Sequence, residues 1–393
     1  METTFMCDTF VVLPPHTKDG VVFGCNSHPP KGELQEVVYF PASECSDHVK
    51  CTYIEVESAG FTKAVILNKT NWMWGAEMGA NECGVAIGSQ PILTINTQGD
   101  HDPHVKRLLG MDLVRLGLER SSNAEEALDV MTQLLEKYGQ GGSSSVHEDF
   151  CHHNSFLIAD PTTAWVLETS GKHWVAHQVK SGFYNISTCI SITTNIDKKS
   201  EGIEEYVKEQ GLWNGEGQFN FCEIFRGDKE TSNPTHSQGK ELLEKLATTG
   251  NFREVNMFSI LRNEESGICE TRSFSTLIKG SQVSELSNSK PSIHWFTATP
   301  DPSMSVFKPF AFTPNVKISK HTVCPDDVSQ PHTLYALHAE AIKKGTDVNN
   351  LLRNMEHECV LELEKLKDEL KEDLSELDEL MKDCVETEVK FYR

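Results

Sequence analysis

The chain has 393 residues, of which 38% are hydrophobic and 24% are charged, enough to bury a large core. Acids outnumber bases 58 to 36, and the formal net charge is -22. This charge disfavours nucleic acids and anionic membranes as partners, because no run of Lys or Arg offsets it. The sequence has no run of about 18 apolar residues and no signal-peptide pattern, so we expect no membrane span and a cytoplasmic location.

The first hundred residues predict β-structure, since short β-branched and aromatic runs are bounded by Pro, Gly and Asp. A hairpin turn is expected at 81–84, where the sequence is Asn-Glu-Cys-Gly. The predicted strands cover 9–13, 21–24, 36–40, 51–56 and 63–67.

Residues 105–138 change to a helical period, with two successive apolar faces that indicate a pair of helices. Asn123 followed by Glu126 is typical of a helix N-terminus, and Gly139 is typical of a C-terminal stop. The Gly- and Ser-rich residues 139–145 predict a loop.

Strand and helix patterns then alternate in blocks, which predicts an α+β fold with packed sheets and helices outside. Helices are expected at 240–247 and 255–262. The later predicted strands cover 155–159, 164–168, 173–176 and 190–194, with a strand-and-turn block at 293–312.

The last 38 residues, 356–393, hold 14 acids and 6 bases and form an amphipathic pattern. This pattern is consistent with a surface helix packed on its own domain. It is also consistent with a short coil for self-association or for a protein partner. The heptad positions are Leu363, Leu366, Leu370, Leu377, Leu380 and Cys384, interrupted by Asp373.

Twelve scattered cysteines without CxxC spacing indicate free thiols, and Cys7 is the candidate nucleophile among them. If 9–13 and 21–25 form a hairpin, opposed residue numbers sum to about 34, which brings Cys7 close to Asn26 and Ser27. Removal of residues 1–6 would give Cys7 a free α-amine that can act as its own base.

We expect no cofactor and no metal. His152 and His153 are metal-type side chains, but adjacent residues on a strand point to opposite faces. The glycines at 139–142 lack the Lys-Ser/Thr ending of a phosphate-binding loop.

The sequence resembles the secernin family over most of residues 7–312, through motifs that are highly specific. These motifs are CDTFV at 7–11, GxNS at 24–27, LQEVVYF at 34–40, CTYI at 51–54, WxWGAEMGANExGV at 72–85, LGMDLVRLGLER at 109–120, KYGQGG at 137–142, HNSFLIAD at 153–160, TPDP at 299–302 and VFKPF at 306–310.

The resemblance implies a dipeptidase A-type cysteine hydrolase of the N-terminal-nucleophile superfamily, with a four-layer αββα sandwich. It implies that Cys7 attacks a peptide or small amide carbonyl after the leader 1–6 is removed. It also implies site roles for Asn26, Asn195 and Arg262 in oxyanion stabilisation or substrate positioning. The simpler interpretations are turn asparagines and a surface helix arginine.

Three positions depart from the family pattern. Cys25 stands where relatives carry Lys or Arg, which weakens activation of the nucleophile. His28 replaces the usual Asp, and Ser89 stands where an asparagine would help to form the oxyanion hole. These departures keep a second hypothesis open: a weakly active or non-catalytic paralogue that regulates exocytosis by binding partners through 356–393.

The expected organisation is therefore a removable leader at 1–6, a hydrolase-like domain at 7–315, a linker and helix at 316–355, and an acidic amphipathic helix at 356–393. The expected substrate is a short peptide or small amide.

Overall fold

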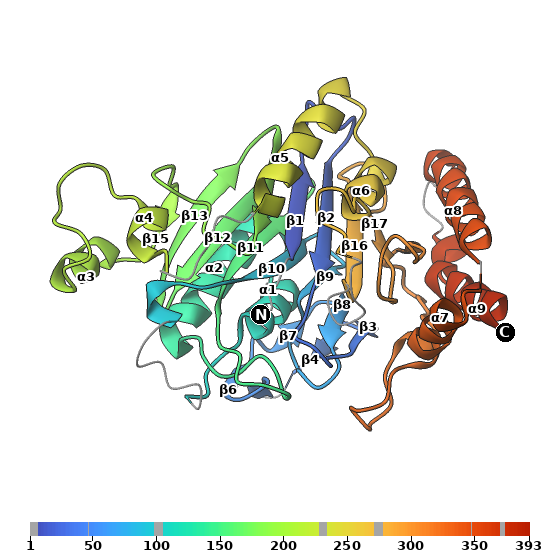
Figure 1. Ribbon diagram of the computed structural model, residues 1–393, viewed down its shortest axis with the longest axis horizontal. Helices are drawn as coiled ribbons and strands as arrows, with labels where there is room; N and C mark the ends of the chain where they lie inside the picture. The colour runs from blue at the N-terminus through green and yellow to red at the C-terminus, as the bar shows by residue number, and fades with distance from the viewer. Residues whose placement is uncertain are drawn as a thin grey trace.

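The computed structural model describes residues 7–45, 47–97, 105–227, 234–270, 278–346, 348–369 and 374–393. In this part of the chain, two large antiparallel sheets pack face to face, and helices cover their outer surfaces (Figure 1). No described helix is long and apolar enough to cross a membrane.

The first sheet has six strands in the order β14-β1-β2-β16-β17-β18, so that the first two strands of the chain lie near its centre. Their bounds are β1 Asp8–Val12, β2 Val21–Ser27, β14 Phe183–Ser187, β16 Gly280–Leu286, β17 Ile293–Phe296 and β18 Lys308–Phe310.

The second sheet has eight strands in the order β15-β13-β12-β11-β10-β9-β8-β3. Their bounds are β3 Gln35–Phe40, β8 Val65–Thr70, β9 Met78–Asn81, β10 Ala86–Ile92, β11 His153–Ala159, β12 Ala164–Ser170, β13 His173–Val179 and β15 Lys198–Lys199. Two small ribbons pair β4 Ser43–Glu44 with β7 Phe61–Thr62, and β5 His48–Lys50 with β6 Glu55–Glu57.

Alternation along the strands divides their side chains between two cores. On β1, Val11 joins the core between the sheets, whereas Phe10 and Val12 face the helices outside. From the second sheet, Leu157 and Val166 enter the same inter-sheet core. The strands are therefore apolar on both faces, as expected of sheets buried between two layers.

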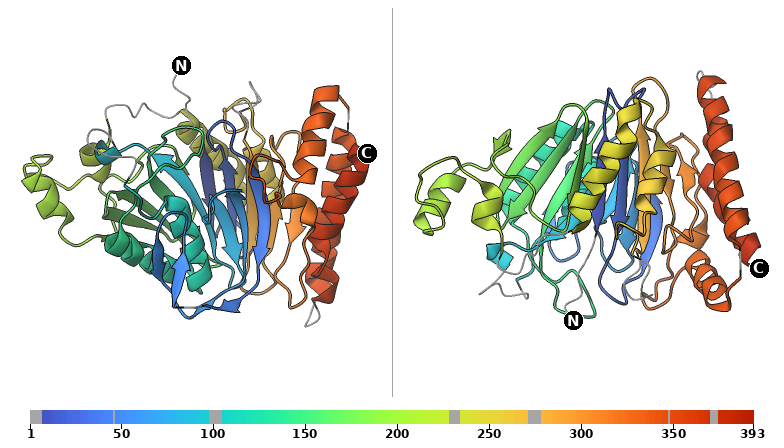
Figure 2. Two further views of the ribbon diagram at one scale, coloured as in Figure 1. Left: turned by 90° about the horizontal axis from the view of Figure 1, so that it is seen from below. Right: turned by 45° about the horizontal axis from the view of Figure 1, so that its top comes forward.

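Two helix pairs form the outer layers. Helices α5 Pro234–Leu246 and α6 Glu254–Leu261 cover the first sheet, and α1 Gly110–Arg120 and α2 Ala124–Tyr138 cover the second. The order of layers is helix, sheet, sheet, helix (Figure 2). The predicted α+β, four-layer αββα arrangement is confirmed.

The α1–α2 pair follows its sequence signals closely. The backbone N–H of Glu126 donates to Asn123 Oδ1 at 2.9 Å and so caps the start of α2. Gly139 ends the helix with a φ of 71°, a left-handed conformation that favours glycine. The hairpin turn expected at 81–84 joins β9 to β10.

The strand predicted at 190–194 is wrong. Glu168 is fully buried on β12, and its carboxylate accepts the backbone N–H groups of Ser191 at 2.7 Å and Ile192 at 2.9 Å. These N–H groups donate to a side chain instead of to a neighbouring strand, so residues 190–194 form no strand. The strand in this part of the chain is β14, which ends at Ser187. The strand expected at 51–56 is also shorter than predicted, since only β6 belongs to a ladder.

The remaining helices lie at the two ends of the sandwich (Figure 1). Helices α3 and α4 lie beyond β13 and β15 at one end. At the other end α8 and α9 pack against β18, and α7 packs against α9. Their bounds are α3 Ile203–Glu209, α4 Phe221–Phe225, α7 Thr333–Lys344, α8 Asn349–Glu369 and α9 Leu380–Tyr392. Short 3-10 helices occur at Ile95–Thr97, Ala247–Thr249, Lys320–Thr322 and Ser375–Leu377.

The acidic tail differs from the single helix predicted over 356–393. Its described residues belong to two helices, because α8 begins at Asn349 and α9 follows the short helix at Ser375–Leu377. Leu363 and Leu377 are buried in the core of the same chain beside β16 and α6. Leu370 and Asp373 lie outside the described residues.

Candidate active site

Cys7 directly precedes β1, in the middle of the first sheet. In the β1–β2 ladder Asp8 pairs with Asn26 and Thr9 with Cys25. The residue numbers of each pair sum to 34, as the hairpin argument predicted. One step beyond this ladder, Cys7 lies opposite Ser27. On the other side Asp8 pairs with Ser187, so the chain that leaves β14 also passes Cys7.

The thiol of Cys7 is 5% exposed and is held by the backbone after β2. The backbone N–H of His28 donates to Cys7 Sγ at 2.9 Å, and Sγ lies 3.6 Å from the carbonyl oxygen of the same residue. Burial raises the pKa of this thiol well above its ordinary value, and the His28 N–H bond offsets only part of that rise. In the chain that retains residues 1–6, Cys7 is therefore a protonated thiol at neutral pH.

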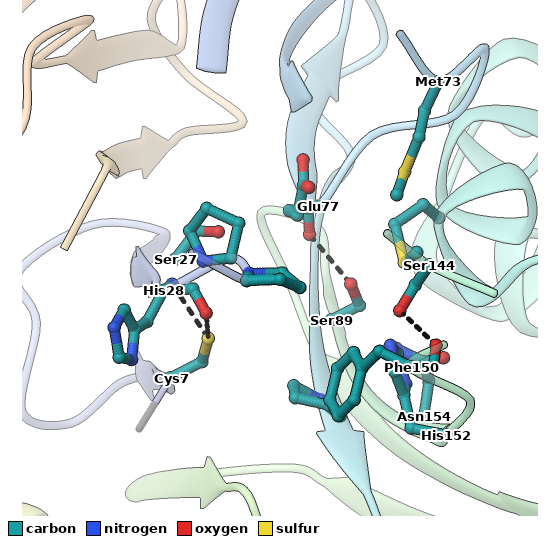
Figure 3. A pocket seen from close by; sticks show the side chains of 14 residues that line it. Cys7, Ser27, His28, Met73, Glu77, Ser89, Ser144, Phe150, His152 and Asn154 are labelled. Carbon is teal, nitrogen blue, oxygen red and sulfur yellow. Dashed lines mark hydrogen bonds between the residues drawn. The ribbon is translucent and has the colours of Figure 1, made fainter. Parts of the chain in front are cut away.

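Cys7 forms one wall of a pocket of about 390 Å³, measured with its open mouth included. Figure 3 shows Cys7, Ser27 and His28 on one side and Met73, Ser144, Phe150, His152 and Asn154 on the other. The two sheets thus contribute opposite walls. The lining residues are Cys7, Ser27, His28, Pro29, Pro30, Met73, Glu77, Ser89, Pro91, Met111, Ser144, Phe150, His152 and Asn154.

These lining residues include a carboxylate but no Lys or Arg. Burial lowers the pKa of His28 and of His152 to about 4, so both imidazoles are neutral at pH 7. Glu77 Oε2 accepts the backbone N–H of Thr70 at 3.1 Å, and burial raises the pKa of its carboxyl. Glu77 Oε1 also accepts the hydroxyl of Thr70. The lining therefore combines apolar side chains with neutral polar groups and one acidic residue whose two carboxyl oxygens are both bonded to Thr70.

The three departures from the resembled family all lie near Cys7. Cys25 points into the inter-sheet core, where it accepts the Thr9 hydroxyl at 3.2 Å, and burial raises its pKa to about 12. It supplies no positive charge to Cys7. His28 and Ser89 line the pocket, but Ser89 Oγ already donates to the backbone oxygen of Glu77 at 3.1 Å.

Asn26 lies beside Cys7 in the sheet but faces away from the pocket. Its amide nitrogen donates to the backbone oxygens of Leu261 at 2.9 Å and Ile268 at 3.1 Å, and its oxygen accepts from Ser281 at 2.7 Å. All of these partners lie on the helix side of the sheet. The side chain fixes the end of α6 to β2 and β16.

Asn195 and Arg262 are not brought to the pocket. Asn195 is exposed, and its amide contacts the imidazole of His177 at 3.1 Å. Arg262 ends α6 and forms a bidentate pair with Glu356 of α8, at 2.7 and 2.6 Å. It also donates to the backbone oxygen of Pro302 at 2.8 Å. The hydrogen bonds of its guanidinium therefore go to α8 and to the segment at Pro302, away from the pocket.

Three side chains of the second sheet were missed by sequence reasoning. Glu77 and Asn154 line the pocket. Gln90, in the orientation that satisfies its amide, donates to the backbone oxygen of Cys7 at 3.3 Å. Their only sequence signal is a polar residue within an apolar strand pattern, which does not reveal the partner across the sandwich.

Asn154 has the least satisfied side chain of the three. It is 1% exposed, and its Oδ1 has no hydrogen-bond partner among the described residues. A Cβ at Gly110, the first residue of α1, would lie 1.9 Å from this oxygen, so glycine is needed where the helix begins. The strand and the helix terminus therefore hold a polar amide against the pocket wall.

A model of peptidase family C69 matches residues 47–238. A curated protein described as a probable dipeptidase, from Latilactobacillus sakei, is 29% identical over 164 residues. The alignment covers 39% of this chain and 33% of the relative, so the chain spans about a third of the relative's length. The matched family segment includes Glu77, Ser89 and Asn154 but not Cys7.

Solved structures with similar folds include a variant of the conjugated bile acid hydrolase from Clostridium perfringens. It is 14% identical, with a TM-score of 0.45, and the match covers 80% of this chain and 99% of that one. A Caenorhabditis elegans N-acylethanolamine-hydrolyzing acid amidase is 11% identical, with a TM-score of 0.38, over 70% and 91% of the two chains.

Proposed function

We propose that this chain is a cysteine-type dipeptidase or small amide hydrolase that uses Cys7 as its N-terminal nucleophile after residues 1–6 are removed. The similarity to peptidase family C69 over residues 47–238 supports a peptidase. We also propose that the relationship extends to the secernins, on the motifs found in the sequence.

The observation that carries this proposal is the place of Cys7. It lies at the start of a central strand, and its sulfur faces a pocket built by both sheets. Among the described residues, the closest hydrogen-bond partner of the sulfur is the backbone N–H of His28 rather than an imidazole or a carboxylate. A site of this kind has a nucleophile but no separate side-chain base.

A free α-amine on Cys7 would supply the missing base. Such an amine has a pKa of about 7.7–8.0, so a useful fraction is neutral near pH 7. It takes the thiol proton, Sγ attacks the substrate carbonyl, and the amine returns the proton to the leaving nitrogen. Water then hydrolyses the thioester and regenerates the thiol.

The polar groups of the pocket suggest how a short peptide binds. Glu77 is the one acidic residue in this lining, and its charged form would favour a substrate with a free ammonium group that also replaces part of its bonding to Thr70. Asn154 offers an amide to the peptide's polar groups. The small volume favours short substrates over long chains.

The altered pocket lowers the expected rate. Ser89 stands where the resembled family has an asparagine, and its hydroxyl is used by the backbone of Glu77. Loss of one oxyanion donor typically costs about 100–1000-fold in turnover. We therefore propose a slow hydrolase.

The test begins with intact mass and N-terminal sequencing of the purified protein, where we expect a chain that starts at Cys7. Turnover of a dipeptide panel should then fall about 1000-fold or more in Cys7→Ala. The matched control is Cys83→Ser, an exposed thiol in the β9–β10 turn, which should leave turnover unchanged.

Two results would contradict the proposal. One is a chain that retains residues 1–6 in an active preparation. The other is dipeptide turnover that survives in Cys7→Ala. If N-acetylated dipeptides were cleaved as fast as free ones, the role given to Glu77 would be wrong while the nucleophile remained supported.

The alternative, a non-catalytic regulator of exocytosis that binds partners through 356–393, receives no specific support from the geometry. The apolar residues of this segment pack against their own chain, as Leu363, Leu377 and Val385 do. A partner that needs this apolar face would have to displace it from the sandwich.

A further inference from the structure

Two cysteines meet where the C-terminal helices cross. Cys359 of α8 and Cys384 of α9 have their sulfur atoms 3.4 Å apart, although they are 25 residues apart in sequence. Cys359 is partly exposed, and Cys384 is 8% exposed. A small oxidant therefore has access to one sulfur while the second lies directly behind it.

Both helices are fixed to the sandwich next to this thiol pair. On α8, one turn before Cys359, Glu356 forms the bidentate pair with Arg262 of α6. On α9, one turn after Cys384, Glu388 pairs with the buried Lys308 of β18 at 2.7 Å. These ion pairs hold the two sulfurs together independently of any bond between them.

We propose that Cys359 and Cys384 form a reversible disulfide that joins α8 to α9. A disulfide needs an S–S separation of about 2.0 Å, so the sulfurs must approach by roughly 1.4 Å, which small side-chain rotations can supply. The reagent that forms this bond is a two-electron oxidant, either a peroxide or a glutathione-type disulfide. The proposal does not depend on the hydrolase activity.

The chemistry balances with hydrogen peroxide. The Cys359 thiolate attacks one peroxide oxygen and becomes a sulfenic acid, and hydroxide leaves. The Cys384 thiol then attacks the sulfenic sulfur, forming the disulfide and releasing water, while the hydroxide takes up the proton that Cys359 lost. The S–H of Cys384 lies against Cys359 and lowers the pKa of that thiol, which favours it as the first sulfur to react.

The test uses the full chain, purified under reducing conditions and then treated with hydrogen peroxide or with oxidised glutathione. We expect a mass loss of about 2 Da for the two hydrogens removed, and a non-reduced peptide map that links Cys359 to Cys384. The melting temperature should rise by about 5 °C, because the bond restrains a loop of the unfolded chain. Dithiothreitol should reverse both changes.

Cys359→Ser, Cys384→Ser and the double variant should lose the link and the temperature shift, whereas Cys83→Ser should keep both. Peptide mapping of the unsubstituted chain gives the answer even if a variant fails to fold. Oxidised protein in which both cysteines are still separately alkylated would overturn the proposal. So would cross-linked dimers formed in place of the internal bond.

Discussion

Cys7 has surroundings that suppress its reactivity in the chain that retains residues 1–6. Its thiol is buried beside the carboxyl of Asp8 and the thiol of Cys25, and both neighbours disfavour a second negative charge. Only the His28 N–H favours the thiolate. No imidazole or carboxylate of the described residues forms a hydrogen bond with the sulfur, whose partners are the backbone groups of His28, which is why we assign the role of base to the α-amine.

Asp8, the residue after Cys7, gives a prediction about pH. It is fully buried, Thr235 donates to its Oδ1 at 2.8 Å, and its Oδ2 has no partner among the described residues. Burial raises the pKa of Asp8 from 3.8 to about 6. Between these pH values the folded chain binds more protons than the unfolded chain. The contribution of Asp8 to the free energy of unfolding therefore increases as pH falls and decreases as pH rises.

We expect Asp8→Asn to gain stability over the parent chain as pH rises from 4 to 7, by about 2 kcal/mol across that window. Urea unfolding of both proteins at several pH values measures the difference. The exposed Asp326→Asn is the control and should follow the parent at every pH. A difference that is constant with pH would contradict the assignment.

The helix α6 illustrates how an element acquires a role that its sequence does not show. Its last turn presents Arg262 to α8, where Glu356 also accepts the backbone N–H of Phe307 at 2.7 Å. The guanidinium further contacts the ring of Phe307, 4.9 Å from its centroid. Arg262 therefore connects three elements, and its place is structural rather than at the pocket.

Arg262→Ala should destabilise the chain by about 3 kcal/mol, because the largely buried Glu356 loses its bidentate partner. Hydrogen exchange should speed up in α8, while KM for a dipeptide should stay unchanged. Lys344→Ala removes an exposed i,i+4 pair with Glu340 and should cost less than about 0.5 kcal/mol. A raised KM without a loss of stability would contradict this structural role and would indicate that Arg262 binds the substrate.

At the scale of the whole molecule, the C-terminal helices complete the sandwich. Helix α9 packs along β18, the edge strand of the first sheet. Lys308 and Glu388 are both fully buried at this contact, and Tyr392 donates to the second oxygen of Glu388 at 2.9 Å. An edge strand covered in this way is protected from pairing with other chains.

This ion pair predicts a strongly non-additive mutant cycle. Lys308→Met and Glu388→Leu should each cost about 3–5 kcal/mol, since each leaves one charge buried without its partner. The double variant should recover most of that loss. Chemical unfolding of the four proteins measures the coupling, and additive costs would contradict it.

Much of the fold could be predicted because its signals are local. The Asn123 cap, the Gly139 stop and the β1–β2 hairpin depend on residues close in sequence, and the hairpin register followed from strand spacing alone. The four-layer arrangement followed from the family resemblance. Cys7 was proposed as the nucleophile mainly through the family resemblance, with the hairpin argument as support, and its place opposite Ser27 agrees with that argument.

The rest depended on contacts between distant segments. The run at 190–194 has strand-like composition, but the carboxylate of Glu168 takes its N–H groups. Arg262 has the sequence context of an active-site arginine, but its partner lies 94 residues away on α8. Asn154 meets the pocket only because the two sheets stack.

The sequence by itself determined many of the elements and the register of the first hairpin, since strand and helix periods and turn residues act over a few positions. Only the tertiary structure decided which polar groups face Cys7 and which hold the helices in place. The physical reason is that a buried carboxylate, amide or guanidinium takes its role from the partner that satisfies it. That partner is fixed by how the sheets and helices pack.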